Sequence, residues 1–172
     1  MSTSALAQST VQVYGRLNLS VERQKLGNNN DWVMQNNSSR IGFKGTEDLG
    51  GGLKAGFQLE HGFNINNGAQ SQPAFWARQS EVNLGGSFGM VRLGNFTSES
   101  YYATADYVSM HNHDTGTSAD RLYAYLGRDT NKIAYRSPSL SGATVEIAST
   151  VSSPTEEDTL DLALNYDRVL ED

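Results

Sequence analysis

The chain has 172 residues, enough for one domain with a sizeable core, and its 13 basic and 19 acidic side chains give a formal net charge of -6. This acidic balance disfavours nucleic acid as a partner, and no run approaches the ~18–20 apolar residues that a membrane-spanning helix needs. The 17 glycines and 3 prolines favour an all-β protein with many tight turns, while the absence of cysteine excludes disulfides and thiolate metal sites.

The N-terminus carries a small-x-small pattern, Ala5-Leu6-Ala7 followed by Gln8, which is typical of a signal-peptide cleavage site. The basic and apolar regions of a complete signal peptide do not precede it. We therefore expect residues 1–7 to be a signal-peptide remnant and residues 8–172 to form the folded chain.

Strict alternation of apolar and polar residues predicts eight strands. The first is Val11–Glu22, with Val, Leu and Gly at odd positions and polar residues at even ones. An asparagine-rich loop is expected at 24–38. The other seven strands are predicted at 39–47, 53–63, 75–84, 90–96, 129–136, 144–152 and 159–167.

Short turns alternate with longer connections along this series of strands. The turns lie at 48–52, 85–89 and 137–142, and the long loops at 24–38, 64–73, 97–127 and 153–158. Such a meander is the plan of a transmembrane β-barrel, whose strands are apolar outside and polar inside. A soluble lipocalin-like barrel alternates in the same way with its faces reversed, so alternation alone leaves both open.

Four segments carry more information than their periodicity. They read TVQVYGRLNLSVE, SSRIGFKGTEDLGGGLKAGFQLEHGF, FWARQSEVNLGGSFGMVRLGN and NKIAYRSPSLSGATVEIAS. In this order they resemble the general diffusion porins of Gram-negative outer membranes, over Val11 to Tyr166. The resemblance implies a sixteen-stranded antiparallel transmembrane β-barrel in outer-membrane lipid, usually a homotrimer, through which small hydrophilic solutes and ions diffuse.

Only eight strands are predicted here, so the resemblance implies the N-terminal half of such a barrel. Eight strands can close a barrel, but side chains then fill its interior and leave no room for an infolded loop of about 30 residues. The third long loop of these porins folds back into the barrel and narrows it. In this chain that loop is expected at about 97–127.

The resemblance also implies a charged constriction, with basic side chains on the barrel wall facing acidic groups on the infolded loop. The matching positions are Arg16, Arg40, Arg78 and Arg128 on the wall and Asp106 on the loop. Met110 stands where a second acidic residue is expected, so either the negative side of the constriction is weakened or Asp114 or Glu99 supplies it.

Alternation supports three of the four wall arginines, because Arg16, Arg40 and Arg128 have the parity of the polar side. Arg78 conflicts with this rule, since strict alternation places it in phase with Val82 on the lipid side, unless a bulge shifts the phase or the residue lies beyond the apolar band. On the same polar face we expect four pore-lining residues: Tyr14, Lys44, Lys54 and Glu60.

No catalytic residue, cofactor or metal is expected, because a diffusion pore breaks no bonds. Two chemical alternatives concern the histidines. His111 and His113, with Asp114, form an H-x-H-D run able to ligate a metal, but a polar loop without further ligands favours solvent exposure. A hydrolase needs a positioned histidine, and the parity of His61 directs it to the lipid side. A soluble or membrane β-barrel for ligand binding or adhesion remains the alternative.

Overall fold

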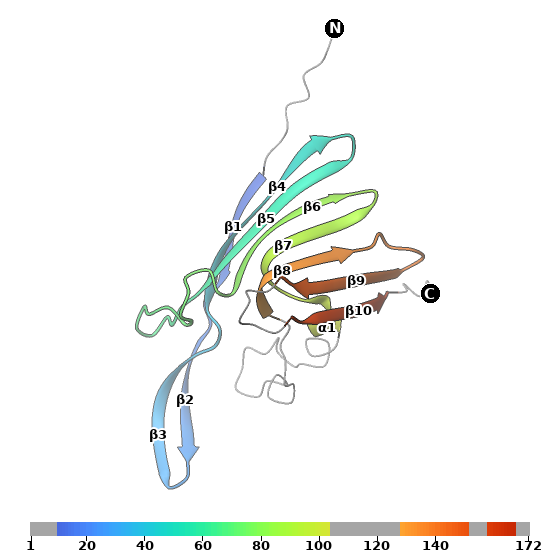
Figure 1. The fold of residues 1–172 in the computed structure, drawn as a ribbon. Coiled ribbons are helices and arrows are strands. Elements are labelled where there is room, and N and C mark those ends of the chain that lie inside the picture. The colour runs from blue at the N-terminus through green and yellow to red at the C-terminus, as the bar shows by residue number, and fades with distance from the viewer. Residues whose placement is uncertain (1–9, 104–127, 152–157, 168–172) are drawn as a thin grey trace, which may run out of the picture.

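The computed structural model describes residues 10–103, 128–151 and 158–167, and these are almost entirely antiparallel β-strands (Figure 1). The elements are β1 (Thr10–Arg16), β2 (Leu19–Leu26), β3 (Asn29–Asn36), β4 (Arg40–Gly50), β5 (Leu53–Gly62), β6 (Gln79–Gly86), β7 (Gly89–Thr97), α1 (Glu99–Tyr101), β8 (Arg128–Arg136), β9 (Ala143–Thr150) and β10 (Leu160–Tyr166). Within these three ranges, no helix has the length and hydrophobicity of a membrane span.

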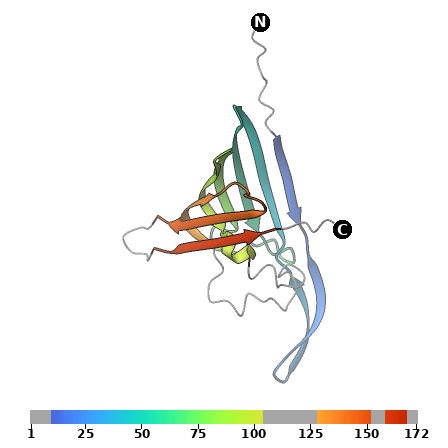
Figure 2. The same cartoon turned by 90° about the vertical axis from the view of Figure 1, so that its right-hand side faces the viewer.

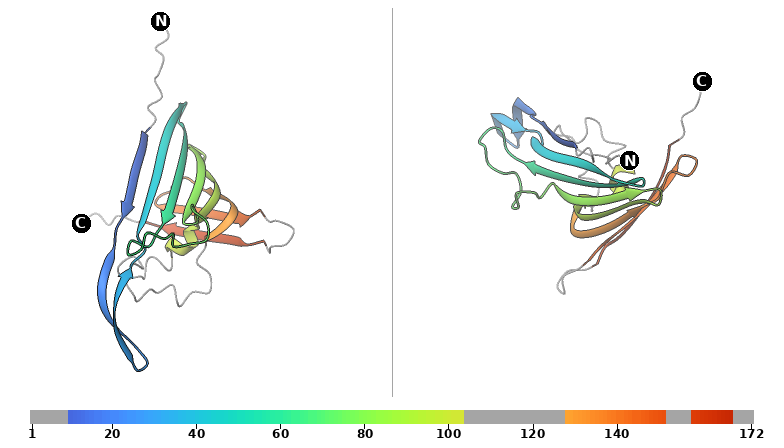
Figure 3. Two further views of the ribbon diagram at one scale, coloured as in Figure 1. Left: turned by 90° about the vertical axis from the view of Figure 1, so that its left-hand side faces the viewer. Right: turned by 90° about the horizontal axis from the view of Figure 1, so that it is seen from above.

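Eight strands form one sheet in the order β1-β4-β5-β6-β7-β8-β9-β10, and every neighbouring pair is antiparallel. The sheet is bent into an open trough (Figures 2 and 3), with α1 on its concave side. Among the described residues, β1 and β10 are the edges of this sheet. The predicted all-β, antiparallel barrel wall is confirmed.

The remaining strands, β2 and β3, pair only with each other and form a hairpin that runs on from β1 and into β4. Two predictions are therefore wrong. The first strand does not run unbroken from Val11 to Glu22, since it is interrupted between β1 and β2, and the expected loop at 24–38 contains β3. The missed signal is Gly27-Asn28, a glycine-containing pair typical of a hairpin turn; Gly27 takes a φ of 61°.

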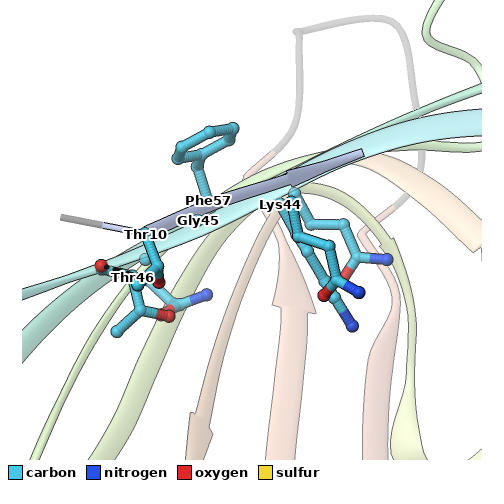
Figure 4. A pocket seen from close by; sticks show the side chains of 9 residues that line it. Thr10, Lys44, Gly45, Thr46 and Phe57 are labelled. Carbon is cyan, nitrogen blue, oxygen red and sulfur yellow. Dashed lines mark hydrogen bonds between the residues drawn. The ribbon is translucent and has the colours of Figure 1, made fainter. Parts of the chain in front are cut away.

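The two faces of the sheet have opposite chemistry. The convex face exposes large apolar side chains on every strand, such as Val82 (55% exposed), Ile147 (48%) and Leu162 (66%). On the concave face, charged side chains are buried, and these are Glu60, Glu81, Arg92, Lys132 and Glu146. Figure 4 shows the division at β4 and β5, where Phe57 and Lys44 point to opposite sides of the sheet.

This arrangement is the reverse of a soluble barrel, in which apolar side chains fill the interior. The buried apolar cluster consists of only Phe96, Ala134 and Ala148 among the described residues. Such a small cluster cannot balance an exposed apolar face in water, since monomeric soluble proteins rarely expose patches beyond a few hundred Å². An apolar exterior around a polar interior is the pattern of strands that cross a membrane.

Candidate functional site: the polar face of the sheet

Three of the predicted wall arginines meet at one place on the concave face. The strand register sets Arg16 directly opposite Arg40. Arg78 donates from Nε to Glu60 Oε1 at 2.6 Å, and the Nε of Arg40 lies 3.9 Å from the same oxygen. Arg40 also donates from Nη1 to the carbonyl of Ser38 at 3.0 Å. We call Arg16, Arg40, Arg78 and Glu60 the arginine cluster.

The position of Arg78 corrects the expectation from alternation, which directed it to the lipid side. The strand β6 begins only at Gln79, so Arg78 lies in the bend before it and is not bound by the strand's parity. Its side chain crosses Gly62 of β5, where an added Cβ would lie 2.7 Å from Arg78 Cδ and 2.4 Å from Ser71 Oγ. Glycine at this position leaves the path by which Arg78 reaches Glu60.

We expect Gly62→Ala to destabilise the full-length protein by about 1–3 kcal/mol, the usual cost of overpacking. The added methyl group would lie 2.4 Å from Ser71 Oγ and 2.7 Å from Arg78 Cδ. Both distances are far inside van der Waals contact, so we expect the methyl group to displace Arg78 from Glu60. Urea unfolding in detergent measures the change. Gly85→Ala is the matched control, since the nearest atom to its new Cβ is 3.8 Å away. Equal stability of the two variants would contradict the packing argument.

Tyr14 and Gln58 complete the polar contacts of Glu60. The Tyr14 hydroxyl donates to Glu60 Oε2 at 3.0 Å and accepts from Gln58 Nε2 at 2.7 Å. Its ring covers Gly42, where a Cβ would come within 2.3 Å of Tyr14 Cζ. The Lys44 Nζ lies 5.5 Å from the centre of the same ring. Glu60 is thus held between a phenol and two guanidinium groups, which keeps its position fixed.

Two hollows extend along the same face toward the short turns. The first is lined by polar groups of β1, β4, β5 and β6, including Gln12, Lys44 and Asn83 (Figure 4). The second lies nearer the turn of β4 and β5 and includes Lys54 and Arg136. All four predicted lining residues therefore lie on the polar face, where alternation placed them; their role as pore lining stays a prediction.

A second charged group, not singled out from the sequence, lies further along the sheet. Arg92 donates from Nη2 to Glu81 Oε2 at 2.7 Å and from Nη1 to Glu146 Oε2 at 3.3 Å. Arg92 and Glu81 are each 7% exposed and Glu146 is 3% exposed. Alternation along β6, β7 and β9 was enough to put these three residues on the polar face. It could not show that they pair across strands.

The start of the segment after β7 is bonded to this group. Glu146 accepts at Oε1 from the Glu99 backbone N–H at 3.1 Å and at Oε2 from Arg136 Nε at 3.1 Å. The Glu99 carboxylate pairs with Arg136 and accepts from Asn165 Nδ2 at 3.1 Å. In the next residue, the Ser100 hydroxyl donates to Asp161 Oδ2 at 2.6 Å. The helix α1 therefore rests on the polar side of β8, β9 and β10.

Phe96 is the one large apolar side chain that is fully buried on this face among the described residues, at 0% exposure. The Arg92 guanidinium carbon lies 4.1 Å from the centre of its ring and the Lys132 Nζ lies 5.2 Å from it, both within cation–π range. Lys132 also donates to the Phe96 carbonyl at 2.9 Å and to Ser98 Oγ at 2.8 Å. These contacts hold the end of β7 where the chain leaves the wall.

The structure does not describe the predicted site residues of the infolded loop. Asp106, Met110 and the H-x-H-D run at 111–114 lie outside the described residues, as does most of the expected infolded loop at 97–127. In the described parts of the chain, no group of three acidic or histidine side chains is arranged to hold a metal ion.

For Arg128 the structure describes the backbone, and the strand is irregular close to it. Arg128 begins β8, where its backbone lies opposite Thr97. The register between β7 and β8 shifts between Gly94 and Phe96 of β7. In β8 itself, three residues after Arg128, Asn131 has a φ of 54°. An irregularity of this kind breaks strict alternation, so the parity of Lys132 and Arg136 does not extend to Arg128. Its place in a constriction stays a prediction from the resemblance.

The geometry defines a class of protein. A curved antiparallel sheet that exposes an apolar convex face and gathers paired charges on its concave face is part of the wall of an outer-membrane β-barrel around a polar lumen. The sequence also matches the family model for Gram-negative porins over residues 1–171. The chain belongs to this family, which confirms the resemblance, and it is accordingly a protein of the Gram-negative outer membrane.

Individual relatives agree with this assignment. Outer membrane porin protein 32 of Delftia acidovorans is 42% identical over 103 residues, which are 54% of this chain and 28% of that protein. An outer membrane porin protein of Bordetella pertussis is 38% identical over 114 residues, or 62% of this chain and 29% of that protein. For the fold alone, the structure superposes on the anion-selective porin from Comamonas acidovorans with a TM-score of 0.68 at 24% identity, covering 94% of this chain and 55% of that one. The chain thus spans about half the length of that solved porin.

Proposed function

We propose that the full-length protein is a passive diffusion channel, a porin, for small hydrophilic solutes and ions across the outer membrane. The observation that carries this proposal is the division of the sheet into an exposed apolar face and a charged, hydrogen-bonded concave face. A pore needs a hydrated, charged lining and no bond-making residue. The relatives named above are porins, which are channels and not enzymes.

We further propose that the arginine cluster forms the basic side of the constriction. Arg16, Arg40 and Arg78 come from three separate parts of the chain to one place on the polar face. Guanidinium groups stay charged at all relevant pH values. Opposite them the proposal places Asp106, so that the field across the narrow passage orders water and favours dipolar or charged solutes over apolar ones.

Glu60 moderates this basic side. Its carboxylate bonds to Arg78 and lies near Arg40, so it neutralises part of the cluster and separates guanidinium groups that would otherwise repel each other. The bonds of Glu99 and Ser100 to the wall support the proposal that the segment after β7 enters the lumen. The homotrimer expected of such a barrel belongs to this proposal as well.

Planar-bilayer recording of the full-length protein tests the function. We expect ohmic conductance that appears in groups of three steps, as three pores of one homotrimer insert together. Absence of any conductance from protein that is folded in the bilayer would reject the channel. The alternative, a ligand-binding or adhesion barrel, predicts that result, and a soluble barrel predicts a monodisperse monomer without detergent or lipid.

A further inference from the structure

The first of the two hollows on the concave face has a lining that differs from the arginine cluster. It is formed by β1, β4, β5 and β6 and has a volume of about 290 Å³ (Figure 4). Small-molecule sites in proteins begin at about this size. Phe57 points away from the hollow to the convex side, so the side chains that line it are polar.

The first row of this lining places one cation between two amides. The strand register pairs Lys44 of β4 with Gln12 of β1 and with Gln58 of β5. Paired residues on neighbouring strands have Cβ atoms about 5 Å apart, so a solute held at the Lys44 ammonium group is within reach of both amides. Lys44 and Gln12 are exposed, which leaves them accessible from the lumen.

The second row, nearer the β4–β5 turn, adds hydroxyl groups above an open floor. Thr46 pairs with Thr10 of β1 and with Gly56 of β5, and Gly56 in turn pairs with Asn83 of β6. Because Gly56 has no side chain, the Asn83 amide can lie across it; a Cβ on Gly56 would be 2.5 Å from Asn83 Oδ1. The hollow therefore combines one cation with amide and hydroxyl groups, which both donate and accept hydrogen bonds.

The positive charge of Lys44 is not neutralised by the acidic side chains near it in the register. Each of those carboxylates faces another cation, and the pairs are Glu60 with Arg78, Glu81 with Arg92 and Asp48 with Lys54. Lys44 itself lies over the ring of Tyr14, and within the described ranges it forms no ion pair with a carboxylate. A solute that enters the hollow thus meets one positive charge among neutral hydrogen-bonding groups.

We infer that this hollow is a binding subsite for small monocarboxylates that carry several hydroxyl groups, such as sugar acids. Lys44 binds the carboxylate, so that one cation matches one negative charge. The hydroxyl groups of the solute bond to the side chains of Thr10, Gln12, Thr46, Gln58 and Asn83. A single ammonium group is a point charge and lacks the fork by which guanidinium groups hold phosphate. The inference rests on the proposed channel, through which such solutes reach the hollow.

Saturation-transfer difference NMR on the folded full-length protein in neutral detergent tests the subsite without measuring a current. The probe is gluconate, compared at constant ionic strength with glucitol, which is neutral, and with acetate, which has no hydroxyl group. Gluconate should bind more tightly than either. Lys44→Gln should weaken gluconate binding about fivefold, the effect of one unit charge at about 4 Å in water, and leave glucitol binding within about twofold. Lys44→Arg should retain most of the gluconate affinity.

Two further variants separate the subsite from a general attraction of anions to the lumen. Lys54→Gln removes a cation that has Asp48 opposite it and should leave gluconate affinity within about twofold. Gln12→Ala should weaken gluconate and glucitol alike by about threefold, because it removes a neutral hydrogen-bonding group.

Three results would overturn the inference. They are an unchanged gluconate affinity in Lys44→Gln, equal losses in Lys44→Gln and Lys54→Gln, and gluconate that binds no more tightly than acetate or glucitol. Bilayer conductance is recorded separately. Protein that conducts but does not bind gluconate contradicts this inference alone, whereas protein that binds gluconate but does not conduct contradicts the channel alone.

Discussion

Arg40→Ser in the full-length protein is expected to shift the reversal potential in a salt gradient toward cation preference, and Asp106→Asn to shift it toward anion preference. A unit charge about 4 Å from a passing ion changes the ion's energy by about 1 kcal/mol in water, which corresponds to about fivefold in a permeability ratio. Arg40 is placed to have this effect, since it lies on the polar face beside Glu60 and opposite Arg16.

The control for this prediction is Arg40→Lys, which keeps the charge and loses only the planar guanidinium. It should retain most of the original selectivity. The shifts should shrink as salt is raised from 0.1 M to 1 M, because the screening length falls from about 10 Å to about 3 Å. Unchanged reversal potentials in both Arg40→Ser and Asp106→Asn would remove these residues from the constriction.

Replacement of Arg92 by leucine is expected to lower the free energy of unfolding by about 3 kcal/mol, the lower end of the cost of breaking a buried ion pair by removing one partner. The change leaves the buried carboxylates of Glu81 and Glu146 without their shared cation. Glu146 retains Arg136 at 3.0 Å, which is why the lower end applies. Urea unfolding of the full-length protein in detergent measures the loss.

Lys44→Gln is the matched control for Arg92→Leu. Lys44 also carries a positive charge on the polar face, but its side chain is exposed and no carboxylate depends on it within the described residues. Its replacement should change the unfolding free energy by no more than about 0.5 kcal/mol. A loss below about 1 kcal/mol in Arg92→Leu would mean that water in the lumen solvates both carboxylates, and that the pairing is not what stabilises this part of the wall.

The two predictions concern two different uses of charge on one face. In the arginine cluster Arg40 and Arg78 flank the single carboxylate of Glu60 and Arg16 lies opposite Arg40, so three cations share one anion and we expect positive charge to remain to act on a passing ion. In the second group Arg92 and Arg136 face Glu81, Glu146 and Glu99, so the charges there largely cancel. We therefore expect the first group to govern selectivity and the second to hold the wall and the segment after β7 together.

The positions of the strands could be predicted from the sequence because each strand of this wall has one apolar and one polar face. Apolar residues therefore recur at every second position along a strand. Seven of the eight predicted strands correspond to β4–β10 of the sheet. The strand β3 and the turn before it were missed because β3 is rich in polar residues, whereas β1 and the first half of β2 lie within the predicted strand Val11–Glu22. The pairing of β2 with β3 depends on the turn at Gly27-Asn28 and on Ser38, not on alternating hydrophobicity.

The fold class, the parity of most of the predicted lining residues and, through the resemblance to porins, the family could all be predicted from the residues. Which charges meet became visible only in the folded sheet. Arg78 reaches Glu60 because it precedes β6 and crosses a glycine, and Arg92 joins two carboxylates from strands far apart in sequence. Alternation reports only which side of a strand a residue occupies. Contacts across strands depend on register, bulges and space above neighbouring glycines, and these are properties of the assembled sheet.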